Sequence, residues 1–135
     1  MIKLNAEELE YMNNFEKMTK AKVVDCILKE NDITFIVEKG NVGLAIGKKG
    51  SIVEKVKNKM GKEIHVYEYS QDPKQFIRNL MFPINILEVE IEKEKATVKV
   101  DPEQKKRAIG REGKKINNVR EIMERHFGIK EIKVI

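Results

Sequence analysis

Two short segments of the sequence have the residue types and spacing of a phosphate-binding loop. Each places two residues between glycines: Gly47-Lys48-Lys49-Gly50 and Gly110-Arg111-Glu112-Gly113. Because glycine has no Cβ, it lets the chain turn sharply between two helices and lets a sugar-phosphate strand approach the backbone. The N–H groups and dipole at the start of the following helix favour a phosphate there, and basic side chains add positive charge. These segments therefore predict loops that contact phosphates.

One such segment is weak evidence, because a corner between two helices without any ligand explains the glycines equally well. Here the pattern occurs twice, at 47–50 and at 110–113, and follows Ala-Ile both times, at Ile46 and at Ile109. The same shift along the chain matches residues 34–37 with 97–100, and it also matches three apolar residues at helical spacing in each copy. The sequence is therefore a tandem duplication with one plan for both copies.

The first copy has the patterns of a helix, two strands, two helices and a closing strand. Asn5 and Glu8 predict the N-cap and the third residue of the first helix. The remaining elements are expected as strands at 23–28 and 33–37, a short helix before Gly47, a helix at 51–60 ended by Gly61, and a strand at 64–67.

The second copy repeats this order. Asp72-Pro73 and Asp101-Pro102 each predict an N-cap followed by a proline at the first helical position. Strict alternation over residues 87–92 predicts a strand with one solvated face. Further strands are expected at 96–100 and 129–135, with a long helix before the last one.

Positive charge is concentrated around the two glycine loops. The whole chain has 27 basic and 22 acidic residues, a net charge of +5. Residues 47–62 contain six lysines and one glutamate, and residues 105–125 contain eight basic and three acidic residues, so each segment carries +5. A solvated lysine-rich helix face explains a single run of this kind. Two matched basic segments favour nucleic acid as the ligand.

Several other classes of protein are disfavoured. One cysteine and two histidines make a structural disulfide or zinc site improbable, and Cys26 fits core packing. A P-loop needs four residues between its first glycine and Gly-Lys, whereas Gly43 and Gly47 enclose three. No paired acid and nucleophile converge, so we expect no enzyme activity, no cofactor, no metal and no small-molecule substrate. Residues 1–8 do not resemble a secretory signal, and no apolar stretch is long enough for a membrane helix, which predicts a cytoplasmic protein.

With its glycine loop and its order of elements, each copy resembles a KH domain, the module in which a G-x-x-G loop clamps a nucleic-acid backbone. The order α-β-β-α-α-β resembles the type II variant. The resemblance implies an α+β fold of two tandem type II KH domains, at residues 1–70 and 71–135, each with helices on one face of a three-stranded sheet. The run 42–50 (Val-Gly-Leu-Ala-Ile-Gly-Lys-Lys-Gly) and the linker 68–73 resemble the tandem KH part of the NusA family of transcription factors, in its short archaeal form.

The resemblance also implies which residues bind single-stranded RNA. In the first copy, phosphates would contact the loop residues and the flanking basic side chains, and apolar side chains would form the floor of the RNA-binding groove. These residues are Ile46, Gly47, Lys48, Lys49, Gly50, Ile52, Val53, Lys55 and Lys57. In the second copy the corresponding residues are Ile109, Gly110, Arg111, Glu112, Gly113, Lys114, Lys115 and Arg120. The chain has few aromatic side chains on which bases could stack, namely five phenylalanines, three tyrosines and no tryptophan. A groove lined by aliphatic side chains is consistent with this composition.

The resemblance implies a non-catalytic RNA-binding protein of transcription elongation, termination or antitermination, with single-stranded RNA and RNA polymerase as partners. Two alternatives stay open: a ribosome-biogenesis or ribosome-associated KH factor, and a KH-fold adaptor that binds proteins. Because Glu112 stands where the first copy has Lys49, we expect the first loop to bind phosphate more firmly, with residues 105–107 (Lys-Lys-Arg) partly compensating in the second.

Overall fold

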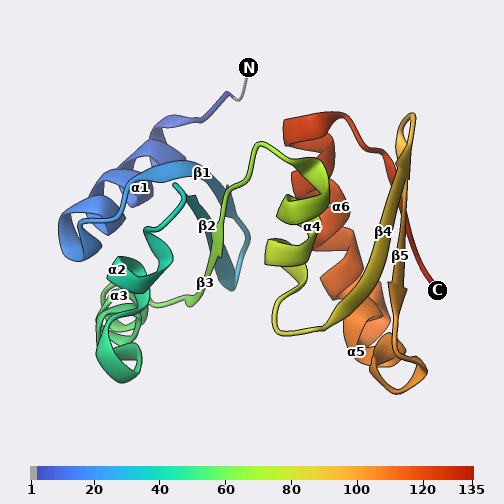
Figure 1. Cartoon of the computed structure of the whole chain (residues 1–135). Coiled ribbons are helices and arrows are strands. Elements are labelled where there is room, and N and C mark those ends of the chain that lie inside the picture. Colours follow the sequence, from blue (N-terminus) through green and yellow to red (C-terminus); the bar gives the residue numbers. More distant parts are fainter. Residues whose placement is uncertain (1–2) are drawn as a thin grey trace. The chain divides into compact units, whose positions relative to one another are not determined.

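The chain forms two compact units whose boundary falls between Ser70 and Gln71. The computed structural model describes residues 3–135, so Met1 and Ile2 lie outside it. Each unit has a three-stranded sheet with its helices on one side, an α+β architecture (Figure 1). Within residues 3–135, no helix is both long and apolar enough to cross a membrane.

The first unit begins with a helix and ends with a strand. Its elements are α1 (Ala6–Thr19), β1 (Val23–Leu28), β2 (Asp32–Val37), α2 (Val42–Ile46), the 3-10 turn η1 (Lys48–Gly50), α3 (Ser51–Met60) and β3 (Glu63–Glu68). The central strand β2 pairs antiparallel with β1 and parallel with β3. The predicted cap of α1 is confirmed, since the Asn5 side chain accepts from the Glu8 N–H at 2.8 Å and the Glu8 carboxylate accepts from the Asn5 N–H at 3.0 Å.

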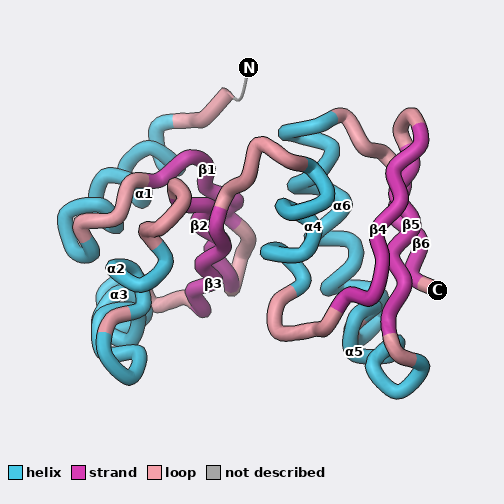
Figure 2. The backbone as a smooth tube through the Cα atoms, viewed as in Figure 1, coloured by secondary structure: helices cyan, strands magenta, loops and turns pink. Residues whose placement is uncertain are grey.

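The second unit repeats this arrangement (Figure 2). Its elements are α4 (Pro73–Met81), β4 (Ile86–Glu92), β5 (Lys95–Val100), the 3-10 turn η2 (Pro102–Gln104), α5 (Lys105–Ile109), the 3-10 turn η3 (Arg111–Gly113), α6 (Lys114–Phe127) and β6 (Glu131–Val134). The central strand β5 again pairs antiparallel with its predecessor β4 and parallel with the last strand β6. The duplication seen in the sequence is therefore a duplication of topology.

Both predicted Asp-Pro caps are confirmed in position, but only one of them makes a side-chain hydrogen bond. The Asp72 carboxylate accepts from the Lys74 N–H at 3.1 Å and caps α4 as expected, but the Asp101 side chain makes no capping hydrogen bond. Asp101 is the N-cap of η2, with Pro102 as the first residue of that turn, and α5 starts only at Lys105. Asp101 therefore stands before a 3-10 turn, and the first N–H groups of the helix lie further along the chain.

A β-bulge interrupts the expected alternation of β4. The pairing of β4 with β5 steps from Ile86 to Glu88, and the consecutive residues Leu87 and Glu88 are both exposed. The first unit has the same irregularity at the equivalent place in β1, between Val23 and Asp25. A bulge adds one residue to one strand and reverses the facing of the side chains. The alternation holds only from Glu88 onward.

The core of the first unit fixes the elements on either side of its glycine loop. The rings of Phe15 and Phe35 stack with centroids 3.9 Å apart, and Cys26 is buried in the same cluster, as expected for a packing residue. Ala45 from α2 and Val56 from α3 belong to this cluster and are fully buried. Both helices that border the loop are thus anchored to the sheet, which holds the loop between them in place.

Candidate nucleic-acid interface

The two glycine loops have the same backbone conformation. In the first, Gly47 has φ 76° and ψ 174°, and Lys49 has φ 55° and ψ 29°. In the second, Gly110 has φ 81° and ψ 170°, and Glu112 has φ 56° and ψ 26°. Each loop therefore turns the chain from a short helix into a longer one through a closely matching sequence of dihedral angles, even though its central side chains differ.

The first glycine of each loop is required by packing as well as by its dihedral angles. A Cβ on Gly47 would lie 2.9 Å from the backbone nitrogen of Ile52 and 2.6 Å from its Cγ1 atom. A Cβ on Gly110 would lie 2.8 Å from the backbone nitrogen of Lys115. These distances are shorter than a real Cβ atom allows, so the turn between the two helices can be this tight only with glycine at this position.

The second glycine has a different task. Gly50 and Gly113 adopt left-handed conformations with φ 76° and 73° and serve as N-caps of α3 and α6. A Cβ on Gly50 would meet only the Cγ1 atom of Val53, at 3.8 Å, so this position has room. Neither cap supplies a side-chain hydrogen bond to the helix. The N-terminal turns of α3 and α6 are therefore not capped by these residues, a condition that favours an anion there.

The charged loop side chains point to solvent. Lys48 and Lys49 are exposed in the first loop, as are Arg111 and Glu112 in the second. The pair in the first loop carries two positive charges, whereas the pair in the second is neutral. All four side chains are accessible to a ligand. The first loop therefore attracts an anion more strongly than the second.

The flanking cations fall into two groups. Lys55 and Lys114 are exposed, whereas Lys115 and Arg120 are half-buried. The Nζ atom of Lys57 lies 3.0 Å from a carboxylate oxygen of Glu63 at the start of β3. This hydrogen bond, together with the charge of Glu63, raises the pKa of the Lys57 ammonium above its usual value.

The ion pair of Lys57 has a consequence for its expected role. The Lys57 side chain is 42% exposed and stays charged at neutral pH, but Glu63 already neutralises part of its field. A phosphate would have to compete with that carboxylate. Sequence patterning could not show this partner, because Glu63 lies on the next strand and not on the same helix face.

The expected apolar residues border the loops within each unit. Ile46 and Ile109 are the last residues of α2 and α5, and both are half-buried. Ile52 and Val53, in the first turn of α3, are half-buried as well. Each unit thus brings its predicted loop, helix start and apolar residues together in one corner of the fold.

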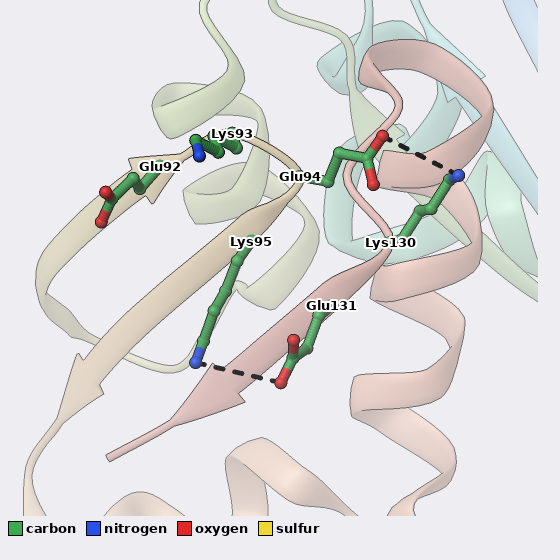
Figure 3. Close-up of a pocket in the computed structure, with 6 residues that line it drawn as sticks. All are labelled: Glu92, Lys93, Glu94, Lys95, Lys130 and Glu131. Carbon is green, nitrogen blue, oxygen red and sulfur yellow. Dashed lines mark ion pairs between the residues drawn. The ribbon is translucent and has the colours of Figure 1, made fainter.

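Away from the loops, a shallow pocket at the β4–β5 turn has balanced charge. It is lined by Glu92, Lys93, Glu94, Lys95, Lys130 and Glu131. Figure 3 shows its two ion pairs, Lys130 with Glu94 at 3.8 Å and Lys95 with Glu131 at 4.0 Å. Since acids and bases are equal in number and partly paired, this pocket offers no excess charge to a phosphate. In the described part of the chain, no group of three acidic, histidine or cysteine residues is placed to hold a metal ion.

Comparison with protein families matches both halves of the chain. Residues 11–86 match the KH domain, and residues 73–135 match the NusA-like second KH domain. These matches confirm the resemblance carried by the glycine loops and by the duplicated topology.

Individual relatives match over nearly the whole chain. The probable transcription termination protein NusA of Methanococcus vannielii is 41% identical, over 99% of this chain and 80% of the relative. The protein of the same name from Methanocaldococcus jannaschii is 36% identical, over 99% of this chain and 75% of the relative. The crystal structure of APE1850 has a TM-score of 0.85 and 30% identity, and the match covers 98% of this chain and all of that one. The chain therefore belongs to the KH-domain family and, within it, to the short archaeal proteins of the NusA type.

Proposed function

We propose that this protein binds single-stranded RNA without catalysing a reaction and acts in transcription elongation and termination. The observation that carries the proposal is the pair of glycine loops with matching dihedral angles, each opening onto the N-terminus of a helix in a basic segment. The relatives that match over nearly the full chain are named as transcription termination proteins, which supports the transcriptional role over a ribosomal one.

We further propose that each unit is a type II KH domain, the first spanning residues 1–70 and the second 71–135. The order helix, strand, strand, helix, helix, strand and the parallel pairing of the last strand with the central one support this assignment in both units. The RNA-facing corner of each domain would then be formed by its glycine loop and the following helix.

Within these corners the residues have separable roles. The backbone around the second glycine and the helix N-terminus bind phosphates, and the exposed cations add electrostatic attraction. The half-buried isoleucines and Val53 offer an apolar surface to the bases. At about four nucleotides for each clamp, the two loops engage RNA of roughly ten nucleotides.

Binding itself is tested by fluorescence anisotropy with single-stranded and duplex RNA of about twelve nucleotides. We expect a clear preference for the single strand, and an affinity that falls steeply between about 50 and 200 mM salt because phosphate contacts release counterions. Binding that is absent, or indifferent to salt, would favour the protein-interaction alternative.

The transcriptional role needs a separate experiment. A tagged copy of the protein, purified from cells under low salt with and without RNase, is expected to bring RNA polymerase with it. Recovery of ribosomal particles in place of polymerase would support the ribosome-associated alternative and contradict this part of the proposal.

The two loops can be ranked with a pair of substitutions matched in size and in backbone conformation. Lys49 and Glu112 occupy equivalent left-handed positions, so Lys49→Glu and Glu112→Lys place each residue in the other's conformation. We expect Lys49→Glu to weaken RNA binding about tenfold and Glu112→Lys to strengthen it severalfold, since one charge-assisted contact contributes about 1.5–3 kcal/mol. If Glu112→Lys leaves the affinity unchanged, the second loop does not contact phosphate.

A further inference from the structure

The second unit exposes an aromatic side chain that has no counterpart in the first. Phe82, at the end of α4, is 73% exposed. In the first unit α1 ends at the buried Thr19, and its C-cap, in the position that Phe82 holds after α4, is Lys20, which is also exposed. An exposed lysine at the end of the first helix of one copy is thus replaced by a solvent-facing phenyl ring in the other.

The same comparison reveals a second difference close by. The short helix before the glycine loop contains Val42, Gly43 and Leu44 in the first unit. In the second unit the equivalent positions, at the start of α5, are Lys105, Lys106 and Arg107, and all three are exposed. One acid, Glu103 in the preceding turn, stands against these three cations, so the segment has a net positive charge.

A hydrogen bond ties the aromatic segment to the basic helix. The N–H of Asn85, which follows Phe82 closely in the chain, donates to the Oε1 atom of Gln104 at 3.1 Å, and Gln104 directly precedes α5. The first unit makes the same connection, where the Lys22 N–H donates to the Oδ1 atom of Asn41 at 2.9 Å. Both copies therefore connect these two segments by an equivalent hydrogen bond. They differ in the side chains that the segments expose.

From this juxtaposition we infer that the second unit has an additional contact for single-stranded RNA, in which a base stacks on Phe82 while neighbouring phosphates meet Lys105, Lys106 and Arg107. We call these four residues the Phe82 surface. An exposed ring beside cations is the combination that single-stranded nucleic acids bind, because every base has a face to stack and every nucleotide a phosphate. This contact offsets the neutral second loop, in which the charges of Arg111 and Glu112 cancel.

The inference rests on the proposed RNA binding and explains an asymmetry within it. The first unit attracts phosphate at its loop through Lys48 and Lys49 but has no exposed ring or basic cluster at the equivalent places. The second unit has a loop pair without net charge, but it has the exposed ring of Phe82 and the three cations at the start of α5. The two copies therefore share one fold and hold RNA with different parts of it.

A tryptophan reporter tests the stacking directly. The sequence contains no tryptophan, so Phe82→Trp introduces a single one, whose emission can be excited separately from that of the three tyrosines. Adding single-stranded RNA of about twelve nucleotides should quench its emission with the same midpoint as the anisotropy titration. Leu9→Trp, at an exposed apolar residue of α1, is the matched control and should not respond. If the emission of Phe82→Trp is blue-shifted and insensitive to RNA, protein covers the ring and the inference is overturned.

Affinity measurements separate stacking from simple apolar contact. Phe82→Tyr should bind RNA as the natural protein does, whereas Phe82→Leu should lose about fivefold to tenfold. Replacing residues 105–107 by glutamine, which keeps helix propensity, should reduce the slope of log K against log salt by about 2. If these variants bind normally while Lys48→Asp/Lys49→Asp does not, the Phe82 surface is not a contact and the proposed function stands. If no variant, the loop variant included, changes RNA binding, the proposed function itself fails.

Discussion

Replacing Lys48 and Lys49 together by aspartate is expected to weaken the binding of single-stranded RNA on the order of a hundredfold. Both side chains are exposed at the tip of the first loop. A hydrogen bond to a charged group contributes about 1.5–3 kcal/mol, and two such contacts would be lost. The slope of log K against log salt should fall by about 1.4, because two fewer phosphates of a single strand are neutralised. Fluorescence anisotropy at several salt concentrations measures both quantities.

This substitution should leave the fold intact. Aspartate tolerates the left-handed conformation of Lys49 better than most residues do, and neither lysine is buried. The matched control is Lys3→Asp/Lys17→Asp, which makes the same change of charge at two exposed residues before and within α1. An equal loss of affinity in the control would show that net charge, and not the loop, governs binding.

Gly47→Ala is expected to destabilise the first unit by more than about 3 kcal/mol, because it combines backbone strain with a steric clash. The backbone of Gly47 has φ 76° and ψ 174°. This region is open essentially to glycine alone, and it costs other residues about 1–3 kcal/mol. The added Cβ would also overlap the backbone nitrogen of Ile52, which cannot move away without shifting α3. Urea denaturation followed by circular dichroism, with amide hydrogen exchange to locate the loss, measures the effect.

Gly50→Ala is the control for this prediction, because it changes the same residue type in the same loop. Gly50 has φ 76° and ψ 13°, a left-handed conformation. Alanine adopts this conformation at a cost of about 1–2 kcal/mol. Its Cβ would find space. The second unit repeats the comparison with Gly110→Ala and Gly113→Ala. Equal stabilities of Gly47→Ala and Gly50→Ala would contradict the distinction between a packed glycine and a capping one.

The elements of this fold could be predicted from the sequence because their causes are local. The Asn5–Glu8 cap, the proline after Asp72 and the left-handed Gly61 act within a few residues, and the structure has each of them. The duplication strengthened the prediction of the glycine loops. One such loop is weak evidence of ligand binding, but its recurrence at the equivalent place in the second copy is much stronger evidence. The sequence therefore determined the α+β class, the element order, the family and the position of the two loops.

The tertiary structure decided which of these residues are exposed to a ligand and which other residues they contact. The closeness of Gly47 to Ile52, the ion pair of Lys57 with Glu63 and the exposure of Phe82 depend on how separate elements pack. The bulge at Leu87 depends on the register between two strands, which no periodicity within one strand reveals. Contacts of this kind are non-local: residue types and spacing specify the helices and turns, but only the folded chain sets which side chains meet and which remain accessible to a ligand.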